Sequence, residues 1–73
     1  MKQVIVYNAL TGVQKKFTVH DKWLHDYVRT ALRDLEVPPQ HQTVPCTQTT
    51  RAGYRQTNLK IGKLTVASVF VSI

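Results

Sequence analysis

The first twenty residues contain two short runs with apolar side chains, separated by a glycine. Residues 2–8 (KQVIVYN) are rich in β-branched and aromatic types, a composition typical of a strand. Residues 13–20 (VQKKFTVH) place apolar side chains at alternate positions, with Lys15 as the exception. Gly12, between the runs, can adopt the left-handed conformation that a short hairpin loop requires. The pattern predicts an N-terminal β-hairpin.

The hydrophobic period then changes from two to between three and four. Across residues 22–36 these spacings produce one wide apolar stripe, which predicts an amphipathic helix. We expect Asp21 to cap it, because a carboxylate accepts from free amides of the first turn, and the pair Pro38-Pro39 to end it. Trp23 and Tyr27 share a flank of the stripe, so we expect both to be buried against a sheet.

The polar segment 40–58 predicts a short strand and an exposed turn. A strand near residues 43–47 is restricted to a sheet edge by Pro45, because proline donates no hydrogen bond to a ladder. Residues 51–55 are expected to form an exposed turn or hairpin tip, where Tyr54 lies between two arginines.

The last fifteen residues predict a second hairpin. Leu59 and Ile61 form a short partner strand, and Gly62-Lys63 form its turn. The final strand, residues 64–73, is almost continuously apolar, as is typical of a central strand covered on both faces.

These elements predict an α+β domain spanning residues 1–73, with one helix packed across a sheet of four or five strands. We expect the last strand to lie beside the first and parallel to it. The sheet would then be mixed, with a right-handed crossover through the helix.

Two short motifs resemble a known superfamily. The hairpin carries LTG at residues 10–12, and VPPQHQ follows the helix at residues 37–42. Together with the final apolar strand they resemble the ubiquitin-like β-grasp superfamily, which implies a β-grasp fold and a role in protein recognition. Conjugated members end in an exposed Gly-Gly, whereas this sequence stops at Val71-Ser72-Ile73, so we expect no C-terminal activation.

The helix also resembles that of Ras-binding domains of the Raf type, through LHD at residues 24–26 and AL at residues 31–32. That resemblance implies basic contacts to an acidic partner from the second strand and the helix. Lys15, Lys16 and Arg33 stand near the matching positions. Thr30 departs from the pattern, because a basic residue is expected there.

Charge is distributed unevenly along the chain. Ten Lys and Arg residues stand against four Asp and Glu, a net of +6, and all four acids fall within residues 21–36. An acid-free basic surface attracts anionic partners at long range. Nucleic acid, an acidic protein face and an anionic membrane surface therefore remain open, although residues 66–73 are too short to span a bilayer.

Catalytic, metal and cofactor chemistry have no motif in the sequence. The single cysteine, Cys46, excludes a disulfide within the chain and is consistent with a reducing cytoplasm. His20, His25, His41 and Cys46 lack paired metal-ligand spacings, and the three glycines are isolated. We therefore expect no enzyme, no metal and no cofactor.

We expect a non-catalytic protein-interaction module, an adaptor or a small inhibitor of the kind phages encode, that presents a basic sheet face to an acidic partner. The alternative is a small nucleic-acid-binding domain that uses the same face and the 51–55 loop. In the first hypothesis Lys16, with Lys2 and Lys60 or Lys63, forms a solvent-facing surface. The candidate binding residues are Lys2, Lys15, Lys16, Arg33, Arg51, Tyr54, Arg55, Lys60 and Lys63.

Overall fold

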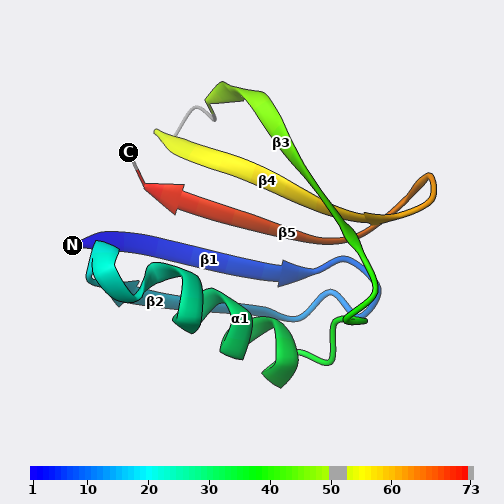
Figure 1. Cartoon of the computed structure of the whole chain (residues 1–73), viewed down its shortest axis with the longest axis horizontal. Coiled ribbons are helices and arrows are strands. Elements are labelled where there is room, and N and C mark those ends of the chain that lie inside the picture. Colours follow the sequence, from blue (N-terminus) through cyan, green and yellow to red (C-terminus); the bar gives the residue numbers. More distant parts are fainter. Residues whose placement is uncertain (50–52, 73) are drawn as a thin grey trace.

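The described residues form five strands and one helical segment (Figure 1). The computed structural model describes residues 1–49 and 53–72, and for residues 45–49 only the backbone. The elements are β1 (Lys2–Asn8), β2 (Gln14–Val19), the 3₁₀ turn η1 (Asp21–Trp23), α1 (Leu24–Asp34), β3 (Gln42–Thr49), β4 (Tyr54–Ile61) and β5 (Leu64–Ser72). The α+β class, the first hairpin and the helix are confirmed. No helix in the described part of the chain has the length and apolar character needed to cross a membrane.

The strands form one sheet in the order β2-β1-β5-β4-β3. The last strand lies beside the first and occupies the centre, and β3 lies at an edge, as predicted. Strand β4 is longer than expected and begins at Tyr54, so Tyr54 and Arg55 lie in a strand rather than in an exposed turn. Arg51 lies outside the described residues.

The expected mixed sheet is wrong for the described pairs, because all of them are antiparallel. Each hairpin reverses the chain, and α1 returns it so that β3 runs in the direction of β2. Two further reversals make β5 antiparallel to β1, with Val4 opposite Val71 and Val6 opposite Val69. This pairing departs from the β-grasp arrangement, in which these two strands are parallel.

The predicted cap by Asp21 is wrong: the side-chain cap lies one residue earlier and belongs to the turn η1, and the N-cap residue of α1, Trp23, makes no side-chain cap hydrogen bond. The His20 side chain, not Asp21, accepts a hydrogen bond from the Lys22 amide, with Nδ1 3.1 Å from the amide nitrogen. Residues 21–23 form the tight turn η1, and α1 proper begins at Leu24.

The helix ends in a Schellman motif before the proline pair. The Glu36 amide donates to the Arg33 carbonyl and the Val37 amide to the Leu32 carbonyl, each at 3.0 Å. Glu36 adopts a φ of 59°, a left-handed conformation that is unfavourable for a residue with a Cβ atom. The chain therefore leaves the helix at the turn itself rather than at the prolines.

Replacing Glu36 with glycine is expected to stabilise the protein by about 0.5–1 kcal/mol, because glycine adopts the left-handed conformation without steric strain. The urea midpoint followed by circular dichroism measures the change. Glu36→Ala is the control, since it removes the carboxylate and keeps the strain. An equal gain in both variants would assign the effect to charge and contradict the conformational explanation.

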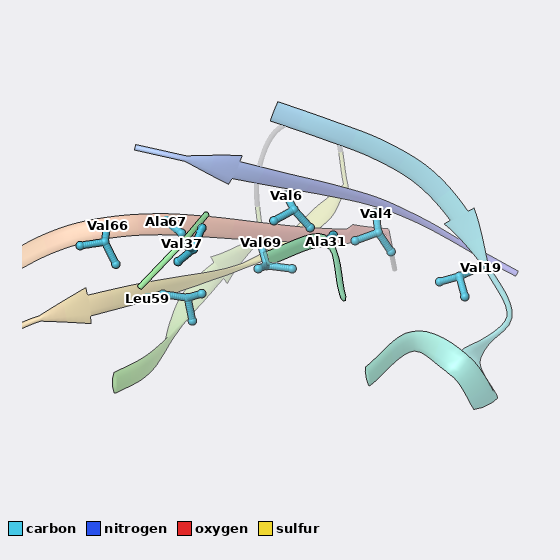
Figure 2. Close-up of a cluster of buried hydrophobic side chains, with 9 residues drawn as sticks. All are labelled: Val4, Val6, Val19, Ala31, Val37, Leu59, Val66, Ala67 and Val69. Atoms are coloured by element: carbon cyan, nitrogen blue, oxygen red, sulfur yellow. The ribbon is translucent and has the colours of Figure 1, made fainter. Parts of the chain in front are cut away.

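The core is built almost entirely from small aliphatic side chains (Figure 2). Its nine buried members come from four strands, from α1 and from the segment after α1, and no aromatic ring is among them. They are Val4, Val6, Val19, Ala31, Val37, Leu59, Val66, Ala67 and Val69. So thin a core in 73 residues gives a stability of only a few kcal/mol.

Helix α1 packs along β1 and β2, and the other strands extend beyond it (Figure 1). Its central line, including the buried Ala31, meets the core. The expected burial of Trp23 and Tyr27 is wrong: they are 50% and 55% exposed. The Tyr27 ring lies at the sheet's β2 border, with its centroid 6.2 Å from that of Phe17.

Candidate functional site

A groove of about 860 Å³ lies between α1 and the half of the sheet that α1 does not cover. The helix forms one wall, through Leu24, Val28 and Leu32. The floor belongs to β4 and β5, where directly opposed residues share a face of the sheet. The remaining lining residues from the sheet and the loop after α1 are Val37, Pro39, Thr43, Thr57, Leu59, Val69 and Val71. An open site lined mainly by apolar groups favours a ligand with an apolar surface of its own.

Cationic side chains border the helix wall. His25, Arg29 and Arg33 are spaced by four residues, so they form one row along α1. Arg29 Nη2 lies 3.0 Å from His25 Nε2. Because a guanidinium only donates, His25 accepts through Nε2 in this contact. The permanent charges of the row are Arg29 and Arg33, and Asp21 is the acid that lines the groove.

The loop after α1 lines the groove and is held by a hydrogen bond within the loop itself. His41 Nδ1 lies 2.6 Å from the Pro38 carbonyl, and since that carbonyl only accepts, Nδ1 carries the proton. This bond turns the loop from the end of α1 toward β3, and His41 and Pro39 both line the groove.

Asn8, buried with 1% exposure, fixes the position of the helix end relative to the sheet. Its Nδ2 donates to the Leu35 carbonyl at 2.7 Å. Its Oδ1 accepts from the amides of Leu10 at 2.8 Å and Thr11 at 3.3 Å in the first hairpin. One amide side chain thus joins β1, the hairpin loop and the helix end.

The opposite face of the sheet is covered by none of the described elements. Ile5, Tyr7 and Phe70 are half-buried there and lie on adjacent strands. Around them are hydrogen-bonded polar groups, with Tyr54 Oη donating to Gln3 Oε1 at 2.9 Å and Ser68 Oγ donating to Asn58 Oδ1 at 3.0 Å. The expectation that the last strand is covered on both faces is therefore wrong.

The structure divides the predicted binding residues between the two faces. Lys16, Tyr54 and Lys60 lie on the open face, by the alternation of β2 and β4. Lys2 is opposite the core residue Val19, so it lies on the helix side and cannot join Lys16 in one surface. Lys63 is exposed in the β4–β5 turn.

The helix-side residues of the set have different surroundings. Lys15 Nζ donates to Asp34 Oδ2 at 3.0 Å, an exposed pair that contributes at most about 1 kcal/mol. Arg55 shares the groove face but is not part of its lining. Of the nine predicted residues, Arg33 lines the groove.

Catalytic and metal-binding groupings gain no support from the described residues. No cluster of three or more potential metal ligands is found among them. Cys46 lies in the part of β3 for which only the backbone is described.

Comparison with protein-family models, characterised proteins and solved structures gives no significant match. The resemblances to ubiquitin-like and Ras-binding domains therefore stay predictions.

Sequence reasoning missed most of the groove. His25, Arg29 and Thr57 were not among the candidate binding residues, and two residues of the floor, Leu59 and Val69, also belong to the buried core. A usable signal was present: one helix of eleven residues has too little surface to cover a sheet of five strands.

Proposed function

We propose that this protein is a non-catalytic protein-interaction module whose docking site is the groove beside α1. Its partner is a protein segment that combines apolar and acidic side chains. The observation that carries the proposal is the juxtaposition of the half-buried apolar side chains of Val28, Leu32 and Val71 with the cationic row that contains Arg29 and Arg33. Apolar burial supplies affinity, and charge at the rim supplies orientation and faster association.

Nucleic acid is the second candidate, and the open face favours it. That face combines aromatic rings with Lys16 and Lys60, and the five strands contain no acidic residue. Its polar groups, however, are largely bonded to one another, and stacking requires rings more accessible than the half-buried Tyr7 and Phe70. The groove is therefore the better-supported site.

Reversing one charge on each face tests the two candidates. We expect Arg33→Glu to weaken binding of a fluorescent acidic peptide of leucine and glutamate by about five- to tenfold, since a partly exposed attraction becomes a repulsion. Lys16→Glu, which changes the net charge equally on the opposite face, is expected to change that affinity less than about twofold. Fluorescence anisotropy at fixed ionic strength measures both.

A labelled oligothymidylate is the second probe. If it binds tightly, if that binding weakens steeply with salt, and if Lys16→Glu reduces it more than Arg33→Glu does, nucleic acid replaces protein as the partner. Equal effects of the two variants on the acidic peptide would show that net charge alone drives binding, and would remove the groove as the docking site.

A further inference from the structure

The uncovered part of the sheet has the dimensions of a second helix. Neighbouring strands lie about 4.8 Å apart, so β4, two strands from β1, lies about 10 Å to its side. Packed helices have axes about 8–10 Å apart. A helix placed beside α1 would therefore lie over β5 and β4, where Leu59, Val69 and Val71 form the floor.

We propose that the partner segment docks as an amphipathic α-helix of about three turns, alongside α1 and over β5 and β4. This inference rests on the proposed function and specifies the partner's conformation and pattern. The groove-lining residues of α1 run from Leu24 to Arg33, which corresponds to about 15 Å of helix. A docked helix of that length completes the helical layer and covers the apolar half of the sheet.

The cationic row specifies where the partner's acids lie. Arg29 and Arg33 are one turn apart, about 6 Å along the axis, on the wall that the partner helix would face. Acidic residues four positions apart on a helix have the same separation. The partner therefore carries Glu or Asp at positions i and i+4, on the flank of its apolar stripe that borders α1.

Two other protein occupants fit the groove less well. A second copy of this chain would bring its own arginine row and a net charge of +6 to a cationic rim. A strand added to the edge of β3 would extend the sheet outward and would leave the half-buried Val28, Leu32 and Val71 without a new contact. A helix beside α1 would cover these side chains and also reach the arginines at the rim.

Two labelled fifteen-residue peptides of identical Leu, Ala and Glu composition test the inference. In one, leucines recur at spacings of three and four, with Glu at i and i+4 on one flank. In the other, leucine and glutamate alternate, as in a strand. We expect the helix-patterned peptide to bind at least about tenfold more tightly, because only it presents a continuous apolar stripe with its acids on one flank. Amide resonances of Thr57, Leu59 and Val69 should shift in the ¹⁵N-labelled protein, and those of Ile5 and Phe70 should not.

The outcomes separate the inference from the proposed function. Equal or tighter binding of the alternating peptide at the groove would overturn the helical inference and leave the docking site in place. Failure of both peptides to bind would remove the proposed function itself. A groove-mediated dimer of the free protein, seen by sedimentation and by broadened Thr57 and Leu59 resonances, would assign the groove to a second copy and overturn both proposals.

Discussion

Asn8→Ala is expected to leave most of the protein unfolded at 25 °C. The substitution removes the donor to the Leu35 carbonyl and the acceptor for two hairpin amides, at a site that is 1% exposed. Buried polar groups left without partners cost about 1–3 kcal/mol each, and the lost side-chain volume adds to that. A total of about 2–4 kcal/mol approaches the whole stability of so small a domain.

Urea unfolding followed by far-ultraviolet circular dichroism measures the loss. Gln14→Ala is the matched control, because Gln14 is an exposed polar residue on the neighbouring strand and its truncation should cost less than about 0.5 kcal/mol. Asn8→Asp separates the two roles of the side chain: an ionised carboxylate still accepts from Leu10 and Thr11 but cannot donate to Leu35. A loss below about 1 kcal/mol in Asn8→Ala would show that the helix end is held by packing instead.

Thr57→Glu is expected to weaken binding of the helix-patterned acidic peptide by about thirtyfold or more, the largest effect on binding. Thr57 lies on β4 opposite Val69 and lines the groove. A carboxylate there would be buried in the apolar floor by the docked peptide and would repel its acids, and desolvation and repulsion act in the same direction. The free protein should fold, because the new side chain can extend into the open groove.

Thr18→Glu is the matched control for this experiment. It makes the same substitution at an exposed position of β2 on the opposite face and gives the same net charge. Anisotropy titrations of both variants, with unfolding curves to verify that each is folded, give the comparison. Similar losses of affinity in the two variants would contradict docking in the groove.

The Asn8 and Thr57 experiments address different links between structure and function. Asn8 tests whether the helix end is held where the groove needs it, and Thr57 tests whether the groove is the site that the partner occupies. A protein that loses peptide binding through Thr57→Glu while keeping its unfolding midpoint would locate the site on the floor formed by β4 and β5.

Local pattern predicted the secondary structure well. The β-branched composition of residues 2–8, the alternation in residues 13–20 and the Gly12 turn predicted β1 and β2, and the three-and-four spacing predicted the helix within about two residues. Pro45 placed β3 at the edge of the sheet. Each of these features depends on backbone preferences and side-chain period within a few residues, which a sequence displays directly.

The direction of the last strand and the burial of Trp23 and Tyr27 were predicted wrongly. The direction of β5 relative to β1 depends on the number of chain reversals between them, and the full length of β4 was not visible in a polar segment. Trp23 and Tyr27 share the stripe of a helix whose narrow contact line includes Ala31, so the outer flank stays half exposed. A stripe indicates which residues can be buried but not how wide the partner surface is.

The hairpin, the amphipathic helix, the apolar final strand and the confinement of the acids to residues 21–36 can all be recognised in the sequence. The relative widths of the two layers emerge only on assembly, where a described sheet of five strands, about 19 Å across, carries one helix about 10 Å wide. The helix lies to one side, and Asn8 holds its end there. The apolar groove beside α1, with Arg29 and Arg33 along it, results from this difference in width. No single segment shows the groove, because it exists only where the packed helix is too narrow to cover the sheet.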